Sequence, residues 1–186
     1  LTYCRPEGSL EQDLFCETYL DPVFGESDHY GNYILEIGDK PEIAFMAHHD
    51  TVHTKGGYQT VTVSNSGHAK SDSNCLGADC TTGVWLILEM IAAGIEGVYV
   101  IHAAEEIGCF GSQGIVSYNP KWLDQVNFAI SFDRKGTKDI ITHQMGMRTA
   151  SDAFALSFAA ATGLDMEADP TGSYTDSNEY ANVISE

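Results

Sequence analysis

The chain has 186 residues and a mass of 20.2 kDa, which is enough for one domain with its own hydrophobic core. It carries 27 Asp and Glu against 9 Lys and Arg, a formal net charge of −18, and this excess of negative charge argues against binding to nucleic acid or to an anionic membrane surface. Since 43% of the residues are hydrophobic, the composition is that of a globular protein and not of a disordered acidic tail.

The cysteines and the lack of long apolar runs indicate a cellular setting. The five cysteines are an odd number, include no C-x-x-C pair, and occur in a chain too long to need a disulfide framework. We therefore expect free thiols in a reducing compartment. No apolar run approaches the roughly 20 residues of a membrane-spanning helix. These features predict a cytoplasmic protein with no membrane or nucleic-acid partner, and they leave its oligomeric state open.

Local patterns divide the chain into helices and strands. In chain order they predict a helix over residues 9–20, strands over 32–37, 43–47 and 58–64, a helix over 81–93, a strand over 97–104, a short helix over 112–118, strands over 127–132 and 140–143, and a helix over 151–162. Ser9 is a candidate N-cap, with Gln12 completing a capping box. Gly94 and Gly163 suit the ends of two of the helices.

The order of these elements predicts the fold class. Apolar strands that alternate with helices are typical of an α/β fold, here with three layers (α/β/α) and a central mixed, mostly parallel sheet covered on both faces. The turn at 38–41 is expected to join the strands 32–37 and 43–47 as an antiparallel hairpin. Because the chain shows no internal repeat, low-complexity segment or flexible linker, we expect a single domain.

Acidic residues and histidines gather where the buried strands end. In open α/β sheets, ligands bind outside the carboxyl ends of the strands. The residues concerned are His48, His49 and Asp50 after the strand 43–47, Asp79 before the helix 81–93, Glu105 and Glu106 after the strand 97–104, and Asp133 after the strand 127–132. Like charges brought together there would repel one another, and bound cations would remove that repulsion.

Two of these groups have a specific chemical logic. Residues two apart on an extended segment point the same way, so Asp50 can orient His48 as a metal-bound imidazole requires. Glu105 and Glu106 are adjacent and tend to point in different directions, so one can bind a metal ion while the other accepts a proton. The alternative for His48 and Asp50 is a surface histidine beside an aspartate in a turn. The alternative for Glu105 and Glu106 is a solvated acidic loop.

The two remaining acids also have simpler alternatives. Asp79 can stabilise the start of a helix as an N-cap or first-turn acid, or it can bridge two cations. Asp133 can bind a cation, or it can form a salt bridge with Arg134 or Lys135.

Taken together, the four segments resemble the co-catalytic dinuclear zinc exopeptidase superfamily, which includes aminopeptidases, carboxypeptidases related to peptidase T, and amide deacylases. The motifs of that family are H-x-D-T-V, G-A-D-D/N-x-x-G, E-E and a later Asp. They correspond, in the same order, to residues 48–52, 77–83 and 105–106 and to Asp133. The resemblance implies a zinc exopeptidase fold and a metal-dependent hydrolase of peptide or amide bonds, in particular an exopeptidase.

The resemblance also implies a role for each matched residue. His48 would bind one metal ion, Asp79 would bridge two, Glu106 and Asp133 would each hold one ion, Glu105 would be the general base and later the proton donor, and Asp50 would orient His48. Two zinc ions about 3.5–4 Å apart are the expected cofactor. Manganese or cobalt also suits a site rich in carboxylates.

Three departures from the family pattern affect these expectations. Cys80 stands where the family often has a second carboxylate. The chain has no room after Asp133 for the inserted dimerisation domain of many relatives, which favours the aminopeptidase-like branch. The only histidine after Asp133 is His143, whereas the last ligand of the family is a histidine near the carboxyl end. We therefore expect residues 1–186 to form a single catalytic metallohydrolase domain that lacks its C-terminal strand and its last metal-ligating histidine.

Arg148 and Asp176 are the candidate substrate-binding residues. The Arg148 guanidinium could hold a substrate carboxylate through two hydrogen bonds, with a surface ion pair as the alternative. Asp176 lies in a late loop that resembles the penultimate loop of the family. His102, inside a buried strand, is expected to be a hydrogen-bonded core residue, and a nucleophilic pair of Cys109 and His102 is disfavoured because no third group orients it.

The expected substrate is a peptide or an acyl amino acid. The alternatives are an amide deacylase or a glutaminyl cyclase-like enzyme on the same fold, and a non-catalytic acidic binding module. The sequence leaves open the choice between aminopeptidase and carboxypeptidase, the preferred side chain, the metal used in the cell, and the reason for the strongly acidic surface.

Overall fold

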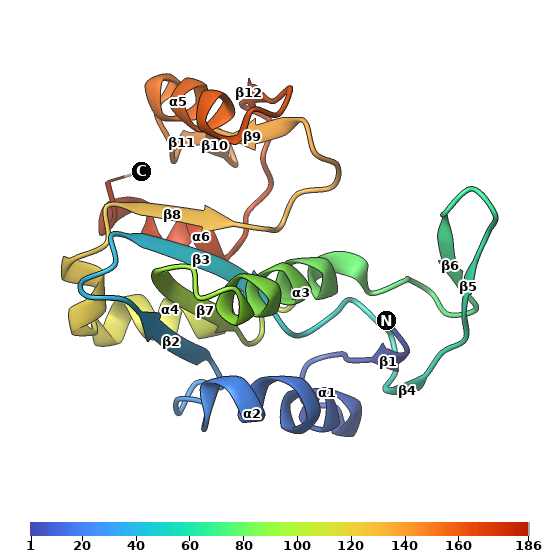
Figure 1. The fold of residues 1–186 in the computed structure, drawn as a ribbon. Coiled ribbons are helices and arrows are strands. Elements are labelled where there is room, and N and C mark those ends of the chain that lie inside the picture. The colour runs from blue at the N-terminus through green and yellow to red at the C-terminus, as the bar shows by residue number, and fades with distance from the viewer. Residues whose placement is uncertain (186) are drawn as a thin grey trace.

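A four-stranded sheet with the strand order β2-β7-β3-β8 runs through the middle of the molecule (Figure 1). The computed structural model describes residues 1–185. Within the sheet, β3 (Ile43–His48) is parallel to both β7 (Gly97–His102) and β8 (Phe128–Ser131), and β2 (Tyr33–Ile37) is antiparallel to β7 at the edge. The mixed, mostly parallel sheet expected from the sequence is confirmed.

The expected hairpin of β2 and β3 is wrong. The two strands follow one another along the chain, but β7 lies between them, and Tyr99 is paired with Leu35 on one side and with Phe45 on the other. All the residues of β7 are buried, and a strand that is mostly apolar is most stable at a position where both faces and both edges are shielded from water. Strands compete for such shielded positions in the sheet. The turn at 38–41 is a local feature, and it does not indicate which strand takes the position beside β2.

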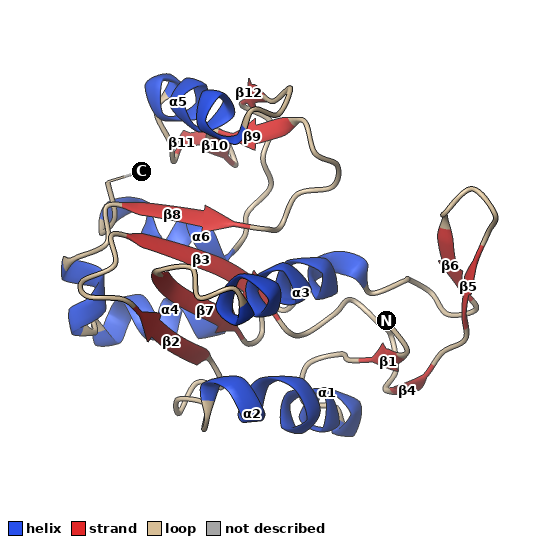
Figure 2. Ribbon diagram, viewed as in Figure 1, coloured by secondary structure: helices blue, strands red, loops and turns tan. Residues whose placement is uncertain are grey.

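Helices cover both faces of the sheet (Figure 2), and the alternation of side chains along β3 and β7 separates two cores. One core joins Phe45, Ala47, Tyr99 and Ile101 to α1 (Leu10–Phe15) and α3 (Ala78–Ala92). The other joins Ala44, Met46, Val98 and Val100 to α4 (Phe110–Tyr118) and to the 3₁₀ helix Lys121–Asp124. The three-layer α/β/α arrangement is thereby confirmed.

The first predicted helix begins where expected, but it is longer and less regular. The Ser9 hydroxyl accepts the N–H of Gln12 at 3.2 Å, and α1 continues through a π-helical turn (Cys16–Leu20) into α2 (Asp21–Phe24). The Gln12 side chain does not complete a capping box. It accepts the N–H of Gly8 at 2.6 Å, because the N–H of Ser9 already bonds to another carbonyl.

The other three predicted helices, α3, α4 and α5 (Asp152–Thr162), are confirmed. In α5 the Ser151 hydroxyl accepts the N–H of Phe154 at 3.0 Å. The helix ends at Gly163, whose φ of 64° lies in the left-handed region that glycine adopts without strain.

The predicted strand 58–64 is divided between two small sheets. Its beginning belongs to β4 (Gly57–Tyr58), which pairs with β1 (Tyr3–Cys4). The rest is β5 (Val61–Val63), which pairs with β6 (Ala69–Ser71) in a hairpin that projects from the body (Figure 1). The two halves therefore have different partners, which the alternation of side chains alone does not reveal.

The predicted strand 140–143 is also divided, in a group of elements that lies beyond β8 together with α5 (Figure 1). The parallel pair is β9 (Asp139–Ile141) with β12 (Glu167–Asp169), and the antiparallel pair is β10 (His143–Gln144) with β11 (Met147–Arg148). The last described helices are α6 (Asp176–Glu179) and the 3₁₀ turn Tyr180–Asn182. Over residues 1–185, no helix has both the length and the apolar character needed to cross a membrane.

Candidate metal centre

The carboxyl ends of β3, β7 and β8 bring one histidine and four carboxylates together. From Nε2 of His48, the last residue of β3, the distance is 3.2 Å to Oδ1 of Asp79, 3.6 Å to Oδ1 of Asp133 and 3.9 Å to Oε2 of Glu105. A carboxylate oxygen of Glu106 lies within 4.8 Å of ligand atoms of His48 and Glu105. Residues from four separate segments therefore meet at one edge of the sheet, as its parallel strands require.

The distances among His48, Asp79 and Asp133 suit a single cation. Ligand atoms bound tetrahedrally to zinc at 2.0–2.1 Å lie about 3.3 Å from one another, and the imidazole nitrogen is 3.2 and 3.6 Å from the two carboxylates. The Cys80 sulfur is within 4.8 Å of the same ligand atoms, but its thiol donates to the Phe132 carbonyl at 3.0 Å. The nitrogen and oxygen donors form a set that zinc accepts.

The centre is closed on most sides and open on one. The side chains of His48, Glu105 and Asp133 are 2%, 12% and 11% exposed, whereas that of Asp79 is 71% exposed. A ligand that enters from solvent would therefore approach past Asp79.

A buried carboxylate connects the histidine to the glutamate pair. Oδ1 of Asp50 is 3.3 Å from Nδ1 of His48, and its two oxygens accept the main-chain N–H groups of Glu105 at 3.1 Å and Glu106 at 3.0 Å. Asp50 is fully buried. The main-chain carbonyl oxygen of Asp50 lies 3.1 Å from the same Nδ1, so Asp50 fixes the imidazole ring through both its main chain and its side chain, while its carboxylate also fixes the loop after β7.

The loop after β7 has an unusual backbone. Ala104 and Cys109, on either side of the glutamate pair, both have a φ of 58°. Residues other than glycine adopt this left-handed region infrequently, and such positions concentrate at functional sites. The surrounding structure, including the bonds from Asp50, holds the loop in this conformation.

Gly83 allows α3 to approach the end of β8. A Cβ at Gly83 would lie 2.5 Å from Sγ of Cys80 and 2.8 Å from the Phe132 carbonyl oxygen, closer than real Cβ contacts. This close approach brings Asp79, at the start of α3, next to Asp133, which follows β8. A larger residue at Gly83 would force Cys80 or the end of β8 to shift.

The close packing of the carboxylates shifts their pKa values. Burial raises the pKa of Glu105 to about 8 against the opposing charge of His48, and Asp133 adds to the rise. Burial also raises the pKa of Asp133 and of Glu106. In contrast, the hydrogen bond from His48 lowers the pKa of Asp79 to about 2. Cations held among these groups would offset both the repulsion and the cost of burial.

Neither predicted substrate-binding residue is placed for that role. Arg148 is exposed, and its Nη1 is 2.9 Å from Oδ1 of Asp152, which is the surface ion pair that the sequence left as an alternative. Asp176 is 2% exposed, accepts the hydroxyl of Ser112 at 2.7 Å and lies 3.2 Å from Nδ1 of His102. Asp176 is therefore buried among these partners and does not face solvent.

Two other expectations about single residues can be compared with the structure. His102 is a hydrogen-bonded core residue, as predicted, since it is fully buried and its Nε2 lies 2.8 Å from the Tyr180 hydroxyl. The alternative in which Asp133 forms a salt bridge with Arg134 is not observed, because Nη2 of Arg134 lies 3.0 Å from Asp139 and 2.8 Å from Asp169.

Three residues of the N-terminal segment, none of them predicted from the sequence, contact the loops that carry the candidate metal ligands. Nε of Arg5 donates to the His49 carbonyl at 2.8 Å, Glu7 accepts the N–H of Ala104 at 3.2 Å, and the Gln12 amide is 3.1 Å from Nδ1 of His49. None belongs to the motifs that carry the family resemblance. The only available signal was a rare basic residue in a strongly acidic chain.

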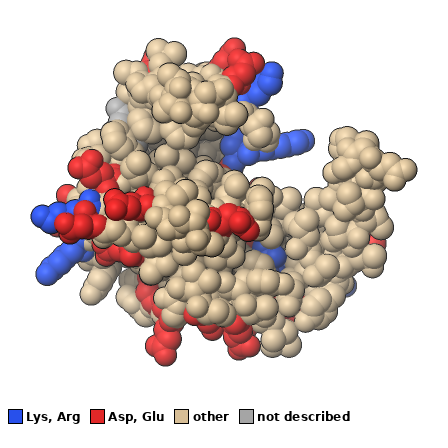
Figure 3. All heavy atoms as spheres, viewed as in Figure 1, with Lys and Arg blue, Asp and Glu red and all other residues tan. Residues whose placement is uncertain are grey.

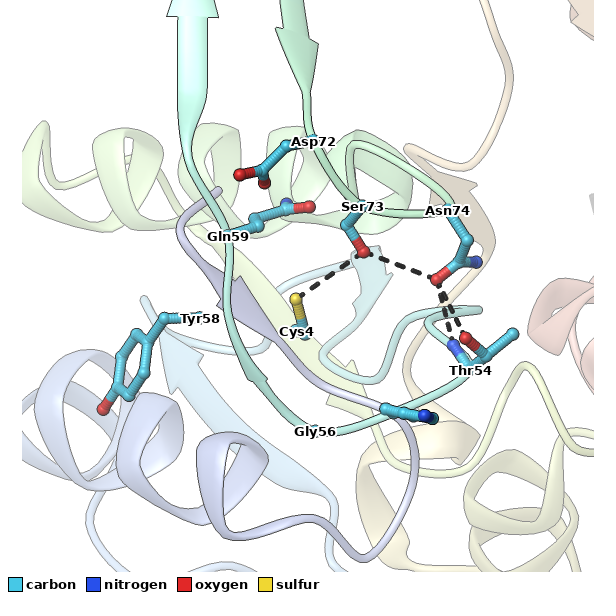
Figure 4. A pocket seen from close by; sticks show the side chains of 9 residues that line it. Cys4, Thr54, Gly56, Tyr58, Gln59, Asp72, Ser73 and Asn74 are labelled. Carbon is cyan, nitrogen blue, oxygen red and sulfur yellow. Dashed lines mark hydrogen bonds between the residues drawn. The ribbon is translucent and has the colours of Figure 1, made fainter.

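A polar cavity of about 350 Å³ lies beside the loop that follows β3 (Figure 4). Among its lining residues, Asn74 accepts the N–H of Thr54 and donates to the Val52 carbonyl, both at 3.1 Å. Asp72 accepts a main-chain N–H at 2.8 Å. None of the residues that line the cavity belongs to the metal centre, and the bonds of Asn74 and Asp72 serve to connect neighbouring loops.

Outside the centre, Asp and Glu are spread over the face seen in Figure 3 and are not gathered in one patch. The centre and Asp50 use five of the 27 acids of the chain (Asp50, Asp79, Glu105, Glu106 and Asp133). The exposed acids on this face form a dispersed negative surface of the kind that favours solubility and repels anionic partners.

Comparison with known proteins gives a family match and several structural likenesses. The model of the family described as Peptidase family M28 matches residues 32–180. No curated protein sequence matches the chain.

Three solved structures illustrate the structural likeness. A TET1 peptidase from Pyrococcus horikoshii has a TM-score of 0.61 and 16% identity, over 93% of this chain and 82% of that one. A tripeptidase from Staphylococcus aureus has a TM-score of 0.57 and 19% identity, over 77% of this chain and 43% of that one. A zinc aminopeptidase from Bacillus subtilis has a TM-score of 0.54 and 18% identity, over 82% of this chain and 37% of that one. At these identities the likeness shows a common fold.

Proposed function

The chain belongs to peptidase family M28, whose model matches most of its length, and from this premise we propose that it is a zinc-dependent exopeptidase with a two-ion centre. The family supports a metal-dependent peptidase. The proposal of a two-ion centre with a glutamate base is supported by the geometry at the strand ends. His48, Asp79 and Asp133 lie at distances suited to one cation, and Glu105 lies beside them.

The donor groups divide between two ions. His48, Asp79 and Asp133 would hold one ion, and Asp79 together with Glu106 would hold the other, so that Asp79 bridges the pair. When bound, the zinc ions would supply Lewis acidity that polarises the scissile carbonyl and lowers the pKa of a water molecule. Their charge would also stabilise a group of acids that is otherwise too crowded to ionise fully.

Glu105 would act as the general base. Its side chain is 12% exposed and its Oε2 is 3.9 Å from Nε2 of His48, which places the carboxylate beside the ligands. Glu105 would take a proton from the attacking water as the new carbon–oxygen bond forms. It would then give that proton to the amine nitrogen as the carbon–nitrogen bond breaks.

We favour cleavage at the amino end of peptides, because a zinc aminopeptidase is among the structures of the same fold. The setting that we favour is the cytoplasm, since the cysteines of the described chain are free thiols and free thiols persist in reducing compartments.

Metal content measured together with activity tests the proposal. We expect about two zinc ions per chain, release of the first residue from unblocked peptides, loss of that activity on chelation, and recovery on addition of zinc. Peptide hydrolysis at an unchanged rate after complete metal removal would contradict a metal-dependent mechanism. Cleavage of acyl amino acids, with no cleavage of unblocked peptides, would support a deacylase instead.

A further inference from the structure

Arg5 is a buried cation without a carboxylate partner. Its side chain is 0% exposed, and among residues 1–185 no ion pair includes its guanidinium. Within the described part of the chain, its Nη1 has no hydrogen-bond partner, and the group lies over the Phe15 ring at 4.0 Å. Burial of an unpaired charge is costly, so the position calls for a specific role.

The guanidinium joins the two segments that carry His48 and Asp79. Nε of Arg5 donates to the carbonyl of His49 at 2.8 Å, and Nη2 donates to Oγ1 of Thr81 at 2.7 Å. His49 directly follows His48, and Thr81 is the second residue after Asp79. A single side chain therefore spans the loop after β3 and the start of α3.

Both ends of this connection are fixed by further bonds. The N–H of Arg5 donates to Oγ1 of Thr51 at 3.1 Å, and the N–H of Thr51 donates to the Arg5 carbonyl at 2.8 Å. At the other end, the Thr81 hydroxyl donates to the Gly77 carbonyl. The contacts of Arg5 thus extend to residues on both sides of Asp79.

We propose that Arg5 is a positioning residue that holds His48 and Asp79 at the separation required by a shared cation. This inference rests on the proposed function, and it concerns a residue outside the range 32–180 that the family model matches. An arginine suits the task because its planar fork donates in two fixed directions, whereas a lysine ammonium is a single point charge.

The charge of Arg5 is consistent with this role. Burial lowers the pKa of Arg5 to about 10, so the guanidinium stays protonated at neutral pH. The negative charge of Asp50 opposes this lowering of the Arg5 pKa, so the positive charge of Arg5 is within electrostatic reach of the carboxylate that contacts His48.

Binding of Co²⁺ to the whole chain tests the proposal, because bound Co²⁺ absorbs visible light in a way that depends on its ligand geometry. We expect Arg5→Met and Thr81→Val each to weaken Co²⁺ binding by about tenfold or more and to change the visible spectrum. Combined, the two substitutions should cost little more than either alone, since they remove the same hydrogen bond. Thr81→Ser keeps the hydroxyl and should bind Co²⁺ as the unchanged chain does.

Tyr99→Phe is the matched control, because it removes a part-buried hydrogen bond, from Tyr99 to the Ile95 carbonyl at 2.7 Å, away from the metal centre. If Arg5→Met lowers the melting temperature as this control does but leaves the Co²⁺ affinity and spectrum unchanged, Arg5 has only a structural role and the inference is wrong. Should Arg5→Met fail to fold, Thr81→Val is compared with Thr81→Ser. Equal Co²⁺ affinities and spectra for these two variants would show that the inference is wrong. Failure of the unchanged chain to bind any metal would overturn the proposed function itself and this inference with it.

Discussion

The Asp50 carboxylate lies 3.3 Å from Nδ1 of His48, the ring nitrogen opposite the one that faces the other metal-ligand candidates. A carboxylate at this position selects the tautomer that leaves Nε2 free for a metal ion. The same carboxylate accepts the main-chain N–H groups of Glu105 and Glu106. The main-chain carbonyl oxygen of Asp50 is also 3.1 Å from Nδ1, so the histidine is oriented by the main chain and the carboxylate of Asp50 together, and the position of the proposed base depends on that carboxylate.

Asp50→Asn is expected to weaken zinc binding by roughly 10–100-fold. An amide cannot accept a hydrogen bond at both of its atoms, so one of the N–H groups of the loop would face a second donor and the imidazole would lose its charged partner. Competition with a chromophoric chelator measures the change. Asp72→Asn is the control, because Asp72 also accepts a main-chain N–H, at 2.8 Å from Thr60, but lies outside the centre. Equal zinc affinities for the two variants would rule out the orienting role of Asp50.

Glu105→Gln is expected to retain zinc and to lower kcat for peptide hydrolysis by roughly 10²–10⁴-fold, the usual contribution of a general base. The amide keeps the size of the side chain but cannot take up a proton. Steady-state kinetics together with metal analysis separate the two effects. Glu89→Gln, an exposed change on α3, should leave both unchanged. A Glu105→Gln variant that turns over at the original rate would falsify the assignment of the base.

Zinc should stabilise the folded chain. At a free concentration of 100 times the Kd, binding adds about 2.7 kcal/mol, which for a domain of this size corresponds to a rise in Tm of roughly 5–10 °C. Differential scanning fluorimetry with and without zinc measures the rise. His48→Ala should abolish it, whereas His68→Ala, at an exposed position in the β5–β6 hairpin, should retain it. A zinc-dependent rise that survives in His48→Ala would place the bound ion elsewhere.

Two residues of α3 should differ strongly in their effect on stability. Ile87 is 0% exposed in the core between α3 and the sheet, and Trp85 on the same helix is 56% exposed. Ile87→Ala should lower the free energy of unfolding by about 2–5 kcal/mol, because it leaves a cavity. Trp85→Ala should change it by about 0.5 kcal/mol or less. Chemical denaturation gives both values, and similar losses would mean that α3 packs through another face.

Cys75 should react with a thiol reagent before the other cysteines. It is half-buried, while Cys4, Cys16, Cys80 and Cys109 are buried. Burial raises the pKa of Cys16 to about 12 and of Cys80 to about 11, which suppresses the reactive thiolate. Labelling with a chromogenic disulfide at neutral pH should show one fast thiol that disappears in Cys75→Ser. Two or more fast thiols in that variant would show that the buried cysteines are accessible.

The sequence allowed much of the fold to be predicted, because that information is local. Apolar runs such as Ile43–His48 and Gly97–His102 fix the strands, and caps such as Ser9 and Ser151 fix the helix starts. The order of the strands in the sheet could not be predicted in this way, because it does not depend on local sequence. The placement of β7 between β2 and β3 results from competition among all the strands for shielded positions, to which the turn at 38–41 does not contribute.

For the candidate site too, one part could be predicted from the sequence and another part only from the tertiary structure. The sequence by itself determined which residues can carry the chemistry, because His48, Asp79, Glu105 and Asp133 each follow or precede an apolar element whose end must face the same edge of the sheet. Only the tertiary structure decided what supports them and what does not take part. Arg5 has no motif, yet folding places its guanidinium between His49 and Thr81, whereas Arg148 has a suitable side chain but is paired with Asp152 at the surface. Hydrogen bonds between residues far apart in the chain depend on how the layers pack, and no local pattern of residues records that packing.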